Sequence, residues 1–217
     1  MKSFKSLFIV AILLCVGASV ANAQFSPVSF GIKGGVNLAN FSGDAQTDVR
    51  FKYQFGTVLQ VNLPAGLFIL SGVEYTAKGA KMTYTGSDSK EYTANFNPQY
   101  LQVPVRLGYK MSVLPTINIK FSGGPYYAYG IAGKAKFNGP VTLNDRSYES
   151  GEKVGIFSSN GLNYDRQDFG VGAGVGIEFL GIIGLDLGYD FGLKNISGND
   201  AAKVRNQNAY LTASLKF

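Results

Sequence analysis

The chain has 217 residues, a formal net charge of +6 and only 16% charged residues, whereas a soluble domain averages about 25%. It contains no histidine and a single cysteine, Cys15, which excludes Ser-His-Asp and Cys-His catalysis and the usual zinc sites. We accordingly expect no metal and no cofactor. The positive charges form no Lys/Arg run, so we expect no nucleic acid partner either.

Residues 1–23 have the layout of a secretory signal peptide. Lys2 and Lys5 precede an apolar run over 7–20, and small residues lead up to Ala23. The run is too short for a membrane-spanning helix. We expect cleavage between Ala23 and Gln24, which leaves residues 24–217 as one barrel domain.

Apolar residues recur at every second position through most of the remaining chain, and this period is the signature of β-strands. The expected strands cover residues 30–41, 51–63, 67–78, 100–110, 117–130, 168–179, 185–194 and 208–217. Each is about ten or more residues long, which exceeds the usual length in soluble proteins and suits a tilted strand that crosses a bilayer.

The connections between these strands alternate strictly in length. The short ones are 64–66, 111–115 and 180–184, and the long ones are 42–50, 79–97, 131–165 and 195–206. This alternation predicts an all-β fold, an eight-stranded antiparallel up-and-down transmembrane β-barrel with four long outer loops and three short periplasmic turns. We expect the bacterial outer membrane as its location.

Glycines decide which strand face points inward. Most of them fall on the polar face, for example Gly108, Gly172, Gly176 and Gly188. A water-exposed face has no need of glycine, whereas a narrow eight-stranded lumen needs small residues beside long ones. We therefore expect the polar face inside and the apolar face toward lipid. Aromatic girdles are expected from Phe30, Phe41, Tyr53, Tyr75, Tyr109, Tyr129, Phe169, Phe179 and Phe217.

The inward face carries many charges, and buried charges need partners. The expected lumen network consists of Lys52, Glu74, Arg106, Lys120, Glu178, Asp186, Asp190 and Lys216, with Lys33, Lys78, Lys110 and Lys194 on the same face. We expect Glu178, Asp186 and Lys216 near the periplasmic end, and Glu74, Arg106, Lys120 and Asp190 higher up. The hypothesis is that these residues plug the lumen with salt bridges. The alternative is a small hydrated pore or ligand cavity lined by the same residues.

Five stretches carry a resemblance to a known family: FGIKGGVNLANFSGD, YLQVPVRLGYK, GGPYYAYGIAGK, DFGVGAGVGIEF and LDLGYDFGLKNIS. With them the chain resembles the Bacteroidota outer-membrane β-barrel family that includes PorT-like proteins, similar in fold to OmpA- and OmpX-type barrels. The resemblance implies assembly by the barrel-assembly machinery, for which the terminal Phe217 would be the signal. One branch of the family is linked to secretion, but the family implies no single activity.

Two functions from different classes follow. The first is a structural or surface-interaction barrel, accessory to secretion, with outer-membrane lipid as its surroundings. In it, loop 131–165 is either a solvated connection or a contact surface for a ligand or partner protein. The second is a porin-like barrel that transports or binds a small solute. We do not expect an enzyme, although Asp186 and Asp190 share a face and leave a carboxylate-only glycosidase formally open.

Overall fold

The computed structural model describes residues 27–43, 47–86, 88–143, 146–197 and 203–217. The strands in this part of the chain are β1 (Val28–Gly43), β2 (Thr47–Asp48), β3 (Arg50–Asn62), β4 (Leu67–Ser71), β5 (Glu74–Ala77), β6 (Lys81–Thr85), β7 (Glu91–Leu114), β8 (Ile117–Phe137), β9 (Val141–Leu143), β10 (Arg146–Tyr148), β11 (Lys153–Gly155), β12 (Gln167–Phe179), β13 (Ile183–Gly192) and β14 (Val204–Lys216). A 3₁₀ turn covers Pro64–Gly66. Within the described ranges, no helix has the length and apolar character to cross a membrane.

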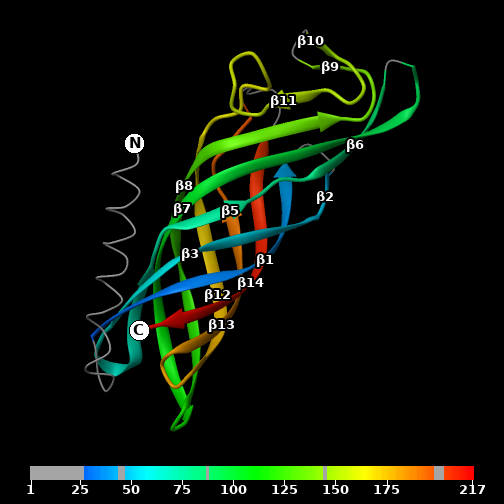
Figure 1. The fold of residues 1–217 in the computed structure, drawn as a ribbon. Helices are drawn as coiled ribbons and strands as arrows, with labels where there is room; N and C mark the ends of the chain where they lie inside the picture. Colours follow the sequence, from blue (N-terminus) through cyan, green and yellow to red (C-terminus); the bar gives the residue numbers. More distant parts are fainter. Residues whose placement is uncertain (1–26, 44–46, 87, 144–145, 198–202) are drawn as a thin grey trace, which may run out of the picture.

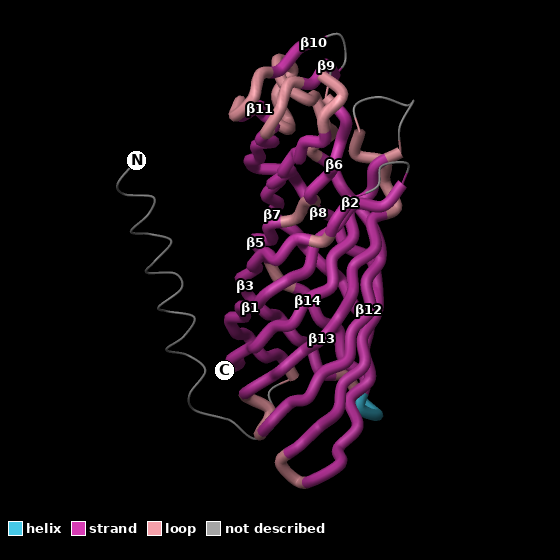
Figure 2. The backbone as a smooth tube through the Cα atoms, turned by 90° about the vertical axis from the view of Figure 1, so that its right-hand side faces the viewer, coloured by secondary structure: helices cyan, strands magenta, loops and turns pink. Residues whose placement is uncertain are grey.

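The long strands close into a barrel of antiparallel pairs (Figures 1 and 2). Around the ring the order is β1, β3, β4 with β5, β7, β8, β12, β13 and β14, and β14 pairs back onto β1 from Gly31↔Lys216 to Gly43↔Val204. Strands β4 and β5 share one position because both lie between β3 and β7. Closure leaves the ring without an unpaired edge, and it confirms the predicted eight-stranded barrel.

Tight turns join strand pairs at one end of the barrel. They are the 3₁₀ turn at 64–66, residues 115–116 and residues 180–182. In the last of these, Leu180 and Gly181 both have positive φ, 53° and 71°. Two successive positive φ values match the right-handed twist of the flanking strands.

The other end contains more strand than the sequence predicts. The expected loop at 79–97 is largely the hairpin of β6 and β7, and the expected loop at 131–165 begins with the continuation of β8. There β7 and β8 pair as far as Ala94↔Phe137, so both strands rise beyond the ring (Figure 1). The alternation that defines strands continues here with Ala94, Phe96 and Ala135 pointing inward.

The side chains divide as the glycine argument predicts, with polar groups inside and apolar groups outside. Asn37 and Gln60 are 1% exposed, whereas Ile32 and Leu107 are 58% and 59% exposed. Phe41 is an exception to the expected aromatic girdle, because it is buried at 6% exposure and packs inside against other aromatic rings. Phe41 lies four residues after Asn37 in β1, so both side chains point inward. The apolar character of Phe41 hides this orientation in the sequence.

Candidate functional site: the lumen and its outer cap

The layer of charges nearest the tight turns is centred on Glu178 of β12. This carboxylate forms ion pairs with Lys216 of β14 and, at 3.2 Å, with Lys110 of β7. Lys120 of β8 lies 4.0 Å from Glu178 and 3.0 Å from Asp186 of β13. Side chains from β7, β8, β13 and β14 thus meet Glu178 or its partners at the lower end of the lumen.

The middle layer is an ion pair between Arg106 of β7 and Asp190 of β13, 2.5 Å apart. The Arg106 guanidinium also donates a hydrogen bond to the Tyr210 hydroxyl and lies 5.3 Å from the Tyr210 ring centroid. Lys33 of β1 and Glu74 of β5 form a second pair at 2.5 Å. Neither pair joins neighbouring strands of the ring: Lys33 and Glu74 flank Gly56 of β3, and β8 and β12 lie between Arg106 and Asp190.

The upper layer holds a fully buried pair, Lys78 and Asp168. The Lys78 ammonium lies 3.1 Å from Asp168 Oδ2, and both side chains are 0% exposed. Asn206 donates to the same carboxylate oxygen at 2.9 Å. The rings of Tyr126 and Tyr100 flank the ammonium, with centroids at 4.4 and 5.3 Å. Ion pairing and cation–π contacts together compensate the desolvation of this lysine.

Inward glycines make room for these long side chains. A Cβ built on Gly172 would overlap with Asp190 Oδ1, and one on Gly176 would overlap with Asp186 Oδ1. On Gly188 it would meet the Tyr210 hydroxyl. The glycine-rich run of β12 is therefore the complement of the charged residues on β13.

Several sequence-predicted residues lie elsewhere than expected. Lys120 belongs to the lower layer rather than the middle one, because the stagger of β8 brings it opposite Gly176 and beside Asp186. Lys52 is separate from these ion pairs, and its ammonium donates to Asn97 Oδ1. The expected cleavage site, Ala23 and Gln24, lies outside the described residues.

Sequence reasoning left out important members of the site. It did not pair Lys78 with Asp168, and it omitted the uncharged partners Gln102, Tyr126 and Tyr210. Gln102 donates to Asp190 at 2.9 Å. The alternation of inward and outward residues could have indicated Asp168, because it lies on the same glycine-bearing face of β12 as Glu178.

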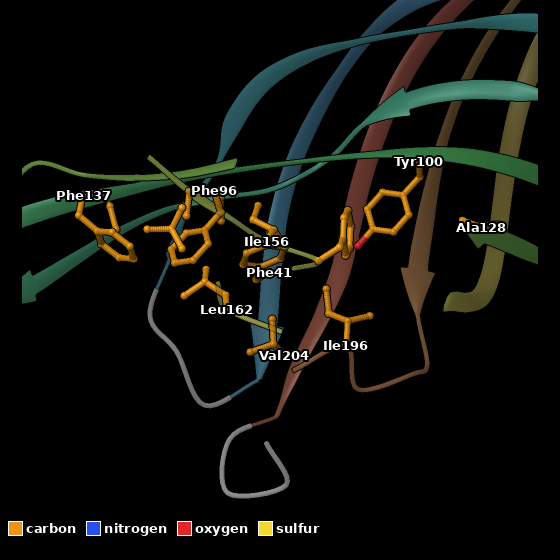
Figure 3. Close-up of a cluster of buried hydrophobic side chains, with 14 of the residues drawn as sticks. Phe41, Phe96, Tyr100, Ala128, Phe137, Ile156, Leu162, Ile196 and Val204 are labelled. Carbon is orange, nitrogen blue, oxygen red and sulfur yellow. The ribbon is translucent and has the colours of Figure 1, made fainter. Parts of the chain in front are cut away.

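An apolar cap covers the charged layers at the outer end (Figure 3). Ile156, Phe157 and Leu162, from the segment between β11 and β12, pack against inward residues of β1, β7 and β8. The Phe157 ring meets Tyr100 edge-on at 5.6 Å, directly above the upper layer. Part of the expected loop 131–165 is therefore a packed lid, and the space above the Lys78–Asp168 pair is filled by apolar and aromatic groups.

The described part of the barrel interior contains a small cavity. One cavity of about 20 Å³ lies between the lower and middle layers, which is room for roughly one water molecule. Its lining includes Lys33, Gln60, Arg106, Lys120, Asp186 and Tyr210. The described residues contain no cluster of histidine, cysteine or acidic side chains suited to a metal ion.

A wider groove of about 590 Å³ opens on the outer surface beside the cap. Its lining consists of Tyr129, Phe157, Asn163, Tyr164, Asp165, Arg166, Gln167 and Ser197. Burial raises the pKa of Tyr164 to about 12. Burial also opposes ionisation of Asp165, but the ammonium of Lys194 at 2.6 Å, together with hydrogen bonds from the backbone N–H groups of Gln167 and Arg166, lowers the pKa of that carboxyl. Asp165 is thus charged at neutral pH.

Comparison with known proteins identifies the class. A family model for the outer membrane protein beta-barrel domain matches residues 22–198. A closed antiparallel barrel with an apolar exterior and this match define an outer-membrane β-barrel, and the chain belongs to that family. Its location is the bacterial outer membrane.

Solved structures with a similar fold are distant in sequence. Neisserial surface protein A is 13% identical, with 88% of this chain and 98% of that chain covered and a TM-score of 0.44. Ail of Yersinia pestis is 14% identical (88% and 100% covered, TM-score 0.42), and a major outer membrane protein of Thermus thermophilus is 13% identical (88% and 100%, 0.48). No curated protein sequence matches this chain.

Proposed function

We propose that this outer-membrane barrel is a closed scaffold that presents an outer contact surface and does not conduct ions or solutes. The carrying observation is the filled lumen, in which charged layers around Glu178, Arg106 and Lys78 are followed by the Phe157 cap. An eight-stranded barrel is just wide enough for side chains to fill its interior. The structural role of the lumen charges is part of this proposal.

Recordings in planar bilayers test the closed lumen. The purified barrel should give no stable conductance, and a known porin inserted in the same bilayer serves as the positive control. Phe157→Ala should also stay closed, because the charged layers beneath the cap remain. A stable ion-selective current that changes in Arg106→Ala would overturn the proposal and favour the small-solute transport barrel.

The contact surface is assigned to the segment that forms the cap and the outer groove. The groove beside Tyr164 and Arg166 combines aromatic and charged groups in a volume typical of ligand sites, about 300–1,000 Å³. A strain that lacks residues 156–164 should keep the barrel and lose adhesion or partner binding at the cell surface. Unchanged adhesion and partner binding in that strain would contradict this assignment.

The narrower relationship to PorT-like proteins of Bacteroidota also belongs to the proposal, and it rests on the five sequence stretches quoted above. It adds export by a cleaved signal, assembly by the barrel-assembly machinery and a role accessory to secretion. Measuring cargo secretion in the same deletion strain checks the last point. Normal secretion in the deletion strain would contradict a role in secretion, while the proposal of a closed scaffold would stand.

A further inference from the structure

A basic face lies on the sheet that rises above the outer rim of the barrel. Lys81 of β6, Lys136 of β8 and Lys153 of β11 occupy one cross-strand row, linked through the pairs Lys81↔Asn95, Asn95↔Lys136 and Lys136↔Lys153. Lys134 lies two residues before Lys136 on the same face. All four lysines are exposed, while their neighbours Ala135 and Val154 point inward and are buried. We call these four residues the basic face.

The arrangement is unfavourable for the protein alone. Directly opposed residues on adjacent strands have Cβ atoms about 4.5–5.5 Å apart, and like charges in such pairs are destabilising. Lys136 and Lys153 form such a pair. Within the described part of the chain, no carboxylate lies within 4.0 Å of any ammonium of the basic face.

Neighbouring residues add to the positive charge. Arg50 Nη1 and the Lys52 ammonium both donate to Asn97 Oδ1, and Asn97 is the cross-strand partner of Lys134. Among the described residues, the acidic neighbours lie at the margins: Asp48 is opposite Lys81 on β2, Glu91 begins β7, and Glu152 accepts a hydrogen bond from the Glu149 backbone N–H. The centre of the face therefore remains cationic.

The height of the basic face identifies the partner. Leu101 and Tyr129 are opposed on the outward side of β7 and β8, where they are 42% and 44% exposed and lie in the lipid-facing belt. The pair Asn97↔Lys134 lies four residues further along β7, which is roughly 14 Å along the strand and about 10 Å along the normal for a tilt near 40°. A lysine side chain at that height reaches the headgroup zone.

We propose that the basic face binds the phosphate groups of the glycolipid in the outer leaflet of the surrounding membrane. The sheet formed by β6, β7 and β8 continues upward from the barrel wall (Figure 1), and the four lysines are exposed on its outward side, where a headgroup beside the protein would meet them. Several ammonium groups in one row suit a partner with several phosphates. This interaction is independent of whether the lumen conducts.

Binding of purified lipid A to the folded barrel in uncharged detergent micelles tests the proposal. Lipid A with its phosphates should bind, dephosphorylated lipid A should bind far more weakly, and raised salt should weaken the binding. A basic residue near an anionic surface contributes about a fivefold factor, so Lys136→Gln with Lys153→Gln should weaken binding about 25-fold. Lys90→Gln with Lys203→Gln, which removes the same charge elsewhere on the outer side, should change it less than twofold.

Three results would overturn the proposal. The first is equal affinity for phosphorylated and dephosphorylated lipid A, which needs only the unaltered protein and therefore holds even if a variant fails to fold. The second is an equal loss in the control variant. The third is tighter binding of a soluble acidic polysaccharide such as heparin than of lipid A, which would place the partner outside the membrane. Inorganic phosphate should not compete at equal concentration.

Discussion

Arg106 and Asp190 join β7 to β13 at mid-height, across the intervening strands β8 and β12. Their pair is 2.5 Å long and nearly fully buried; Gln102 adds a hydrogen bond to Asp190, and Tyr210 accepts one from Arg106. A buried pair of this kind contributes little over an apolar substitute, but removing one partner leaves an uncompensated charge. Removing one partner of the pair should therefore lower the free energy of unfolding.

We expect Asp190→Ala to lower the free energy of unfolding by about 3–5 kcal/mol, because Arg106 is left buried and unpaired. Arg106→Leu combined with Asp190→Leu should cost less. Urea denaturation followed by the mobility shift of the folded barrel on unheated gels measures both. Asp88→Ala, which removes an exposed partner 3.9 Å from Lys90, is the control and should have little effect. Equal stability of Asp190→Ala and the unaltered chain would contradict the expectation.

Gly172 shows why the inward face needs glycine. The Asp190 carboxylate occupies the space that a side chain at position 172 would need. We expect Gly172→Val to destabilise the barrel by about 1–3 kcal/mol through overpacking, with a reduced yield of folded protein after refolding. Gly34→Val is the matched control, since a Cβ at Gly34 meets no atom closer than 3.9 Å. Similar yields for the two variants would show that the lumen can rearrange around the added side chain.

At the scale of single elements, the outward side of β7 defines the lipid-facing belt. Val105 lies on it at 50% exposure, beside the inward Arg106. Val105→Arg should cost roughly 2–4 kcal/mol if it lies near the bilayer midplane, and folding in vesicles of defined lipid measures this. Thr83→Arg is the control because β6 lies above the ring and Thr83 is already exposed to solvent. A normally assembled Val105→Arg would reverse the inside-outside assignment.

The last strand closes the ring and ends on Phe217. The Phe217 backbone N–H donates to Phe30 O at 2.6 Å, and the Phe30 N–H donates to Phe217 O at 3.3 Å. These are terminal bonds of the β1–β14 ladder, so we predict that deleting Phe217 changes the unfolding of a finished barrel little. If Phe217 is the assembly signal, the deletion should slow insertion in cells, as measured by pulse-chase of the folded form. Insertion at the normal rate would refute that role.

At the scale of the whole molecule, the two ends of the barrel differ in construction. The tight turns end just below the Glu178 layer, whereas the outer end carries the β6–β7 hairpin, the cap and the basic face. This asymmetry predicts one orientation in the membrane.

Single cysteines test that orientation, because Cys15 lies in the expected signal peptide and the rest of the chain has no cysteine. Ser150→Cys, at the exposed outer end, should react with an impermeant maleimide on intact cells. Thr116→Cys, in an exposed tight turn, should react only after the outer membrane is permeabilised. The opposite pattern would invert the topology.

Local sequence pattern determined the architecture of this protein. Strict alternation, strand length and alternating connection lengths lead to the barrel, and the glycines on one face indicate the lumen. These signals are local, because each strand must present one face to lipid and one to the interior whatever its neighbours are. The same parity placed Glu178 and Asp190 inside, although it could not say which charges would meet.

Tertiary structure alone decided the pairing of charges and the closure of the outer end. Lys120 meets Asp186 rather than the middle layer because ring closure sets the stagger between strands, and that stagger depends on the whole sheet. Phe41 and Phe157 became core residues because β7 and β8 continue beyond the ring and create an interior that needs apolar filling. The row of Lys81, Lys136 and Lys153 likewise exists only through cross-strand register, since these residues are far apart in the chain and adjacent strands bring them together.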